Sequence, residues 1–139
     1  MESMQAFMQE WEEYLNRDPI LKKRNNNYKS TISEGEAIVE VEVEGRGLLT
    51  VELVGERLKV RPDKAAHAIL SWSVPLPLFK EVLLGSEKLL FALVDGRCKL
   101  SFHTPRFTHW NGTTALAVIL AAQEMVKRSP EARSLLEAL

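Results

Sequence analysis

Apolar residues at spacings of three and four predict a helix near the start of the chain. They include Met4, Phe7 and Trp11, and acidic residues fill the opposite face. This pattern is typical of a helix that packs one side against a core, and an acidic polar face favours core packing over binding at a membrane surface. Asp18 and Pro19 then offer a cap and a first-turn proline for a second short helix. We therefore expect N-terminal helices within residues 3–24.

Strict alternation of apolar and polar residues between positions 37 and 61 predicts three antiparallel strands. Glycine-containing turns at Gly45-Arg46-Gly47 and Gly55-Glu56 separate them. The outer face of this meander would carry a polar row: Glu40, Glu42, Glu44, Thr50 and Glu52. A docking surface is one interpretation of the row. A solvated sheet face is the favoured one, because alternation alone produces it.

The segment from Ala66 to Val74 is mostly apolar and predicts a more central strand covered on both faces. Every second residue would share one face: Ala66, Ala68, Leu70, Trp72 and Val74. The two faces differ less in polarity here than in the meander. This strand is therefore expected further inside the sheet than the first three.

Two apolar segments of helical length follow, and each stops at a glycine, Gly85 and Gly96. A period-two strand begins directly after the second glycine. The two segments carry more apolar surface than short surface helices need, so we expect both helices to line a shared interior. The sheet and these central helices would together occupy residues 36–103.

The last third predicts a loop from Thr104 to Gly112 and a helix from Thr113 to about Arg128. Between Ala115 and Ala122 this helix is apolar on every side, so protein or something apolar should surround it. Ser129 and Pro130 then begin a final helix. We expect C-terminal helices within residues 113–138 and a single domain over residues 1–139.

Composition narrows the range of possible functions and does not change the predicted fold. The chain has 139 residues, 45% of them hydrophobic, which is enough for one core without metal or disulfide staples. Its 18 basic and 19 acidic residues give a net charge of -1, which provides no field to hold nucleic acid. The sequence has one cysteine, no N-terminus of signal type and no apolar run long enough to cross a bilayer. These features favour a cytoplasmic protein without a transmembrane segment.

Catalytic groups are sparse in the sequence. Cys98 shares a strand face with apolar neighbours and His103 points the other way, so we interpret Cys98 as a small buried hydrophobe rather than a nucleophile. His103 and His109 lack further ligands for a metal site. No phosphate-binding loop or dinucleotide fingerprint occurs, so no cofactor is expected.

The stretch from Trp72 to His103 nevertheless carries a recognisable order of elements. Leu83-Leu84-Gly85 ends one apolar helix, and the run from Ala92 through Gly96 to Lys99 and Leu100 turns into a strand. This order resembles the sterol carrier protein type 2 family of lipid-transfer domains. The family usually places another glycine beside Asp or Asn after that strand, whereas this chain has His103-Thr104-Pro105. The resemblance implies an α+β fold with a five-stranded, largely antiparallel sheet covered by helices.

The residues alone favour an ordinary core over a ligand cavity, and the resemblance reverses that preference. It implies a non-catalytic carrier or accessory protein that holds a fatty acyl chain, a sterol-like molecule or another lipid in an apolar tunnel. The expected tunnel residues are Trp72, Leu76, Phe79, Leu83, Leu89, Leu90, Leu93, Phe102, Leu116, Ile119 and Leu120. Leu116, Ile119 and Leu120 would form one helical stripe nearest the ligand.

Two other functions remain open at this point. The first is an interaction module whose apolar groove receives a partner helix or pairs two copies as a homodimer. The second, less favoured, is a small hydrolase or isomerase for an apolar substrate with His103 or His109 as the base. Neither histidine has an evident orienting partner in the sequence.

Overall fold

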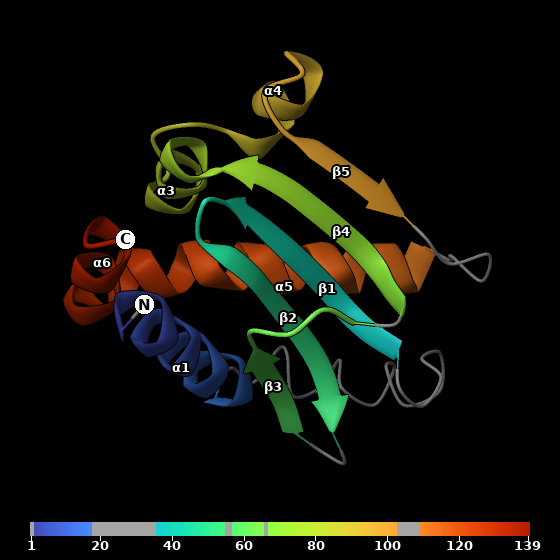
Figure 1. Ribbon diagram of the computed structural model, residues 1–139, viewed down its shortest axis with the longest axis horizontal. Helices are drawn as coiled ribbons and strands as arrows, with labels where there is room; N and C mark the ends of the chain where they lie inside the picture. The colour runs from blue at the N-terminus through green and yellow to red at the C-terminus, as the bar shows by residue number, and fades with distance from the viewer. Residues whose placement is uncertain (1, 18–35, 55–56, 66, 103–108) are drawn as a thin grey trace.

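Helices and strands form almost where the periodicity of the sequence places them (Figure 1). The computed structural model describes residues 2–17, 36–54, 57–65, 67–102 and 109–139. The elements in chain order are α1 Glu2–Arg17, β1 Glu36–Glu44, β2 Gly47–Val54, β3 Arg57–Arg61, β4 His67–Pro75, α3 Leu76–Leu84, α4 Leu89–Val94, β5 Lys99–Phe102, α5 His109–Arg128 and α6 Pro130–Glu137. The second helix expected around Pro19 lies outside the described residues.

The five strands form one mixed sheet in the order β3-β2-β1-β4-β5. β1, β2 and β3 pair antiparallel as the expected meander, and β5 pairs antiparallel with β4. β1 and β4 run parallel, so β1 becomes the central strand and the chain must cross the sheet between β3 and β4. The prediction of an α+β fold with a largely antiparallel, five-stranded sheet is confirmed.

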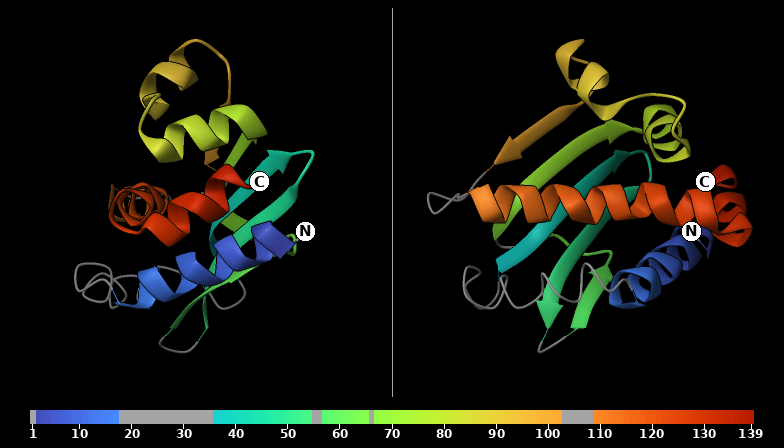
Figure 2. Two further views of the ribbon diagram at one scale, coloured as in Figure 1. Left: turned by 90° about the vertical axis from the view of Figure 1, so that its left-hand side faces the viewer. Right: turned by 180° about the vertical axis from the view of Figure 1, so that it is seen from behind.

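The helices cover one face of this sheet (Figure 2). Apolar side chains of α1, α3 and α5 meet the strands there in one core, which contains a chain of aromatic rings. Ring centroids are separated by 6.4 Å for Trp11 and Phe7, 6.2 Å for Phe7 and Phe79, and 5.7 Å for Phe79 and Trp72. The indole N–H groups of both tryptophans are buried without a hydrogen-bond partner among the described residues. Apolar packing therefore holds this cluster together.

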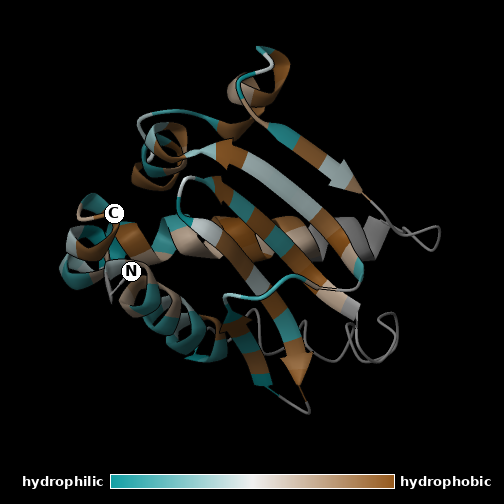
Figure 3. Cartoon of the chain, viewed as in Figure 1, coloured by the Kyte–Doolittle hydropathy of each residue, from teal (hydrophilic) through white to brown (hydrophobic). Residues whose placement is uncertain are grey.

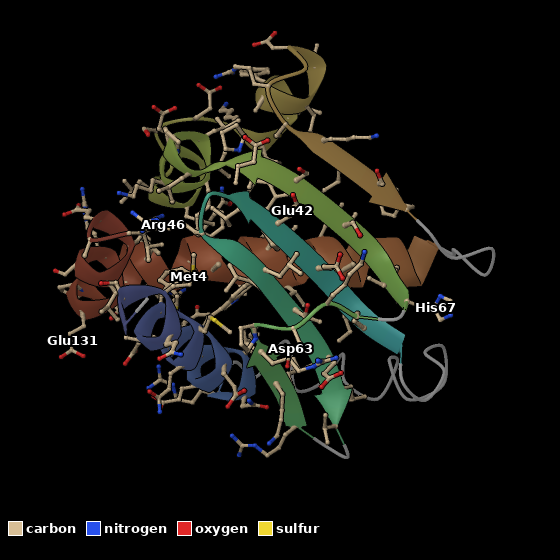
Figure 4. All side chains as sticks on the ribbon, in the orientation of Figure 1. Met4, Glu42, Arg46, Asp63, His67 and Glu131 are labelled. Atoms are coloured by element: carbon tan, nitrogen blue, oxygen red, sulfur yellow. The ribbon has the colours of Figure 1, made fainter. Side chains whose placement is uncertain are left out.

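The opposite face of the sheet is polar, and the segment between β3 and β4 crosses it. Figure 4 looks onto this face and shows Glu42 on β1 and Asp63 on the crossing segment. The Thr50 hydroxyl donates to the Asp63 carbonyl, and the Ala65 N–H donates to Glu40 over 3.0 Å. Thr50 is consequently fully buried, so the polar row is not solvated along its whole length.

The alternation of β4 is interrupted near its start. Ala68 packs with Ala37 and Ala65 in a small cluster apart from the main core, whereas Ile69 and Leu70 both join the main core. In the same region, the pairing of β1 with β2 is shifted by a bulge between Ala37 and Val39. A bulge adds one residue to a strand and breaks the strict alternation of faces. The expectation that Ala68 shares a face with Leu70 is therefore wrong.

The ends of the helices follow local sequence signals, with one exception. Gly85 ends α3 in the left-handed conformation with φ 83°, which glycine adopts without steric cost, and the Ser129 hydroxyl caps α6 by accepting from Ala132 N over 3.2 Å. The exception is α5, which begins at His109 and not at Thr113. It includes Gly112, because extending an existing helix adds one hydrogen bond per residue and offsets the cost of about 1 kcal/mol for glycine.

Side chains of α1 satisfy the free edge of β3. The Asn16 amide donates to the Leu58 carbonyl over 2.8 Å and accepts from the Leu58 N–H over 3.0 Å. A Glu12 carboxylate oxygen accepts from the Val60 N–H over 2.8 Å. These contacts replace the missing neighbouring strand and fix α1 against the sheet.

Replacing Asn16 by Ala is expected to destabilise the protein by about 1 to 3 kcal/mol, because it removes both hydrogen bonds from Leu58. The free energy of unfolding in urea measures this effect. Gln9→Ala on the same helix is the matched control, since Gln9 is exposed and should change stability by less than about 0.5 kcal/mol. Equal stability of the two variants would contradict the edge contact.

Candidate functional site

The expected tunnel residues separate into three groups by their exposure. Four belong to the main core and are at most 2% exposed: Trp72, Phe79, Leu83 and Ile119. Four others are half-buried: Leu76, Leu89, Leu93 and Leu116. Three are exposed: Leu90 at 66%, Phe102 at 44% and Leu120 at 50%. The set therefore spans the core and the surface.

The stripe expected on α5 is divided between two environments. Ile119 is buried among the core residues, as are Ala115, Val118 and Ala122 of the same helix. Leu120, one residue further and about 100° around the helix, is half exposed. Leu116 lies four residues before Leu120 on the same side. Ile119 is buried, Leu116 packs partly buried against the same core and Leu120 is half exposed, so the expected stripe runs from the core to the surface.

α4 is the second departure from the expected interior. Ala92 is fully buried and Leu89 packs against the core, so one side of this helix faces the protein. The other side carries Leu90, Phe91 and Val94, which are 66%, 55% and 77% exposed. A helix without a polar side chain must expose apolar groups when it packs on only one side. The two central helices, α3 and α4, therefore do not bury all of their apolar sides in a shared interior.

A pocket of about 550 Å³ opens where α3, α5 and α6 meet. Its lining residues are Leu83, Leu84, Gly85, Leu120, Gln123, Glu124, Val126, Lys127 and Arg133. Two members of the expected set, Leu83 and Leu120, are therefore brought together here. The left-handed turn at Gly85 ends α3 beside the pocket, and the Gln123 amide fixes α5 against α3 by donating to the Val82 carbonyl over 2.9 Å.

The pocket is lined by apolar and by charged side chains. We call the apolar ones, Leu83, Leu84, Leu120 and Val126, its floor, and the charged ones, Glu124, Lys127 and Arg133, its rim. Arg133 pairs with Glu137 over 3.1 Å, and Glu124 approaches Arg128 at 3.9 Å. No ion pair of Lys127 is recorded within the described ranges. The arrangement suits an amphiphile that buries a chain and presents a negative group to the rim.

Sequence reasoning missed all four polar pocket residues, Gln123, Glu124, Lys127 and Arg133. Leu120, Gln123 and Lys127 recur at three and four along α5, which places them on one side of the helix. That spacing was a usable signal. The contribution of Arg133 had no such signal, because it depends on how α6 folds back against α5 and α3.

The candidate catalytic and metal-binding residues are only partly described by the structure. No group of three or more His, Cys, Asp or Glu residues there could hold a metal ion. Cys98 is half-buried just before β5 and packs against the main core, so it is less deeply buried than expected. His103 lies outside the described residues, and only the backbone of His109 is described. None of the described helices is long and apolar enough to span a membrane.

Comparisons with known proteins agree with this architecture. No family model and no curated protein matches the chain. Among solved structures, it is similar to the ubiquinone synthesis protein UbiJ-SCP2, with a TM-score of 0.57 and 15% identity over 86% of this chain and 92% of that one. It is also similar to sterol carrier protein 2, with a TM-score of 0.54 and 21% identity over 86% and 95%.

A third similar structure is a conserved hypothetical protein from Thermus thermophilus that is described as a candidate sterol carrier protein. It matches with a TM-score of 0.51 and 22% identity over 86% of each chain. All three structures cover most of the chain and are sterol carrier protein type 2 domains or are described as related to them. The resemblance indicated by the stretch around Gly85 and Gly96 is confirmed, and the chain has the sterol carrier protein type 2 fold.

Proposed function

We propose that the protein is a non-catalytic carrier or accessory protein that binds a lipid with an acyl chain in the pocket between α3, α5 and α6. The pocket carries this proposal. Its volume of about 550 Å³ lies within the range of about 300–1,000 Å³ typical of small-molecule sites. Its floor contains Leu83 and Leu120, which the sequence already marked as ligand-binding.

The position of the pocket explains how a ligand could reach the remaining expected residues. Leu83 belongs to the main core together with Phe79, Trp72 and Ile119. Leu116 continues the side of α5 that Leu120 presents to the pocket. A chain that extends beyond the pocket would therefore displace core contacts first at Leu83. We propose that Leu83 and Leu116 form the inner wall of the site.

The charged rim supports a preference for an anionic head group. Lys127 and Arg133 are on the rim; Glu137 pairs with Arg133, whereas Glu124 approaches Arg128. A carboxylate at the rim would gain a charge-assisted hydrogen bond from Lys127 while its chain contacts the leucines. Fatty acids fit this pattern better than uncharged sterols, so we propose a fatty acyl ligand.

Affinity for saturated fatty acids is expected to rise with chain length by up to about 0.8 kcal/mol, or roughly fourfold, for each added methylene until the pocket is full. The physical reason is the removal of each methylene from water by the apolar floor. Displacement of a fluorescent fatty acid, measured across a series of chain lengths, gives the slope and the plateau.

Fatty alcohols of matched length distinguish the contribution of the acyl chain to the affinity from that of the head group. An alcohol of equal length should bind more weakly than the acid, and Lys127→Gln should reduce that difference. A flat chain-length series would contradict the acyl site. A partner helix or a second copy that occupies the same pocket, seen as competition with the fatty acid, would favour the interaction module instead.

A further inference from the structure

The polar face of the sheet carries a hollow over β1, β4 and β5, on the side opposite the helices. Its volume is about 110 Å³, and its lining includes six polar residues: Glu40, Glu42, Ser71, Ser73, Lys99 and Ser101. In Figure 3 the middle of β4 is pale, which marks intermediate hydropathy, beside the hydrophilic bands of β1. We call this hollow the β4 trough. The pocket between α3, α5 and α6 uses none of its residues.

The strand register gives the β4 trough two walls of opposite charge. Glu42 of β1 lies opposite Ser73 of β4, and Ser73 lies opposite Lys99 of β5. Ser71 of β4 and Ser101 of β5 are likewise opposite each other. Residues opposite each other on neighbouring strands point to the same face of a sheet. Because serine is short while glutamate and lysine are long, the serines form the floor between an acidic wall on β1 and a cationic wall on β5.

The polar groups of both walls and of the floor are available to an occupant. Glu42 and Lys99 are exposed, and the three serines are half-buried. Over the ranges that the structure describes, no side-chain hydrogen bond or ion pair is recorded for any of these five residues. β1 and β5 are two strand spacings apart, which is about 10 Å. One occupant of the β4 trough can therefore contact a carboxylate, hydroxyl groups and an ammonium group together.

The segment that crosses this face between β3 and β4 shows how the face holds a polypeptide chain. The Thr50 hydroxyl donates to the carbonyl of Asp63, and the Glu40 carboxylate accepts from the N–H of Ala65 over 3.0 Å. Both backbone groups are thus satisfied by side chains of the sheet. The β4 trough offers the same two kinds of group beside this segment, a carboxylate at Glu42 and hydroxyls on the serines. It is therefore suited to the backbone of a second polypeptide segment.

We propose that the β4 trough binds an extended segment of a partner protein, with a basic side chain of that segment at Glu42 and an acidic side chain at Lys99. Each charge of the segment then meets the opposite charge on its wall, which fixes the position of the segment across the strands. The walls are about 10 Å apart, and an extended chain advances about 3.3 Å per residue. Long side chains shorten the required span, so the two charged residues of the partner lie two or three positions apart.

A small zwitterion is the weaker alternative, because the hollow surface continues beyond the β4 trough. A second hollow of about 320 Å³ shares Glu40 and Glu42 with it and reaches Glu44 at the turn between β1 and β2 and Lys64 on the crossing segment. Figure 4 shows Glu42 on the open face between these two hollows. A small molecule fills only one of them, whereas a polypeptide segment can occupy both.

Selection from a random peptide library displayed on phage tests the proposal. We expect the wild-type protein to enrich peptides that carry a basic and an acidic residue two or three positions apart. A selected peptide, labelled with a fluorophore, should bind less tightly in added salt, since both of its charge pairs are near the surface. Glu42→Gln and Lys99→Gln should each weaken its binding about fivefold, and the double variant about twentyfold. Selection against Glu42→Lys should no longer enrich the basic residue.

Glu13→Gln is the matched control. Glu13 is exposed on α1, which covers the other face of the sheet, so this variant should bind the selected peptide like the wild type. Selection without a shared charge pattern, or equal peptide binding by the double variant and the wild type, would overturn the proposal. So would a wild-type dimer that the double variant dissociates, since a second copy would then cover the face. Competition for the selected peptide by glycine betaine at equal affinity would assign the β4 trough to a small zwitterion instead.

Fatty-acid titration separates this inference from the proposed function. The Glu42→Gln/Lys99→Gln variant should bind fatty acid like the wild type, because neither residue lines the pocket between the helices. Loss of peptide binding with unchanged fatty-acid affinity supports the docking surface. Loss of both would show that these side chains maintain the fold and would count against it. If the wild type binds the selected peptide and no fatty acid, the carrier function fails and the docking surface remains.

Discussion

Phe79→Ala is expected to destabilise the protein by about 3 to 5 kcal/mol, the range for truncating a buried aromatic side chain. Phe79 is 1% exposed on α3, and its ring contacts Phe7 of α1 and Trp72 of β4. Its removal leaves a cavity where two helices and the sheet meet. The free energy of unfolding in urea, measured with the wild-type slope as reference, gives the effect.

Phe91→Ala makes the same chemical change at an exposed position. Phe91 is 55% exposed on α4, so its truncation should cost no more than about 1 kcal/mol, including its contact with Lys88. Similar losses in the two variants would show that α4 is buried more deeply than described. A small loss in both would show that the aromatic cluster is not central to stability.

The adjacent residues Ile119 and Leu120 are expected to respond oppositely to tryptophan. Ile119 is 1% exposed in the core, and Ile119→Trp should overpack it and lower stability by about 1 to 3 kcal/mol or more. Leu120 is half exposed and lines the pocket, so Leu120→Trp should leave the fold intact. By filling the pocket, it should weaken fatty-acid binding at least about tenfold.

Thermal unfolding and fatty-acid titration of both variants check this pair. Leu120→Ala is the control for the loss of the leucine itself and should weaken binding less than Leu120→Trp, because it leaves the pocket open. Unchanged affinity in Leu120→Trp would exclude the pocket as the acyl site. A stable Ile119→Trp variant that loses binding would place the ligand on the core side of α5.

Local sequence patterns were sufficient for most elements of the fold. The alternation around Val39 and the glycine turns defined the meander, and the apolar runs that stop at Gly85 and Gly96 defined α3 and α4. These signals lie within a few residues of the element that they specify. No local signal in the sequence predicts the parallel pairing of β1 with β4. The neighbours of a central strand are determined by contacts across the whole sheet. The bulge in β1 belongs to its pairing with β2 and has no local signal either.

The functional site was less predictable because its residues belong to different helices. Hydrophobicity identified Leu83 and Leu120 but could not show that Leu120, unlike Ile119, is half exposed and lines the pocket. The distinction follows from the rotation of α5 about its axis, which the sheet and α6 determine together. Leu90 shows the same limit, since its apolar character is equal to that of Leu89 and only packing decides which of the two is exposed.

The contact of α1 with β3 also bears on self-association. An unpaired strand edge is a template for further strands, and this sheet has two edges, β3 and β5. β5 is four residues long and begins with an exposed lysine, which limits strand addition there. β3 instead depends on Asn16 and Glu12 of α1 to occupy its Leu58 and Val60 backbone groups. A chain whose first helix detaches would therefore present an open edge and aggregate by sheet extension, even with the rest of the core still folded.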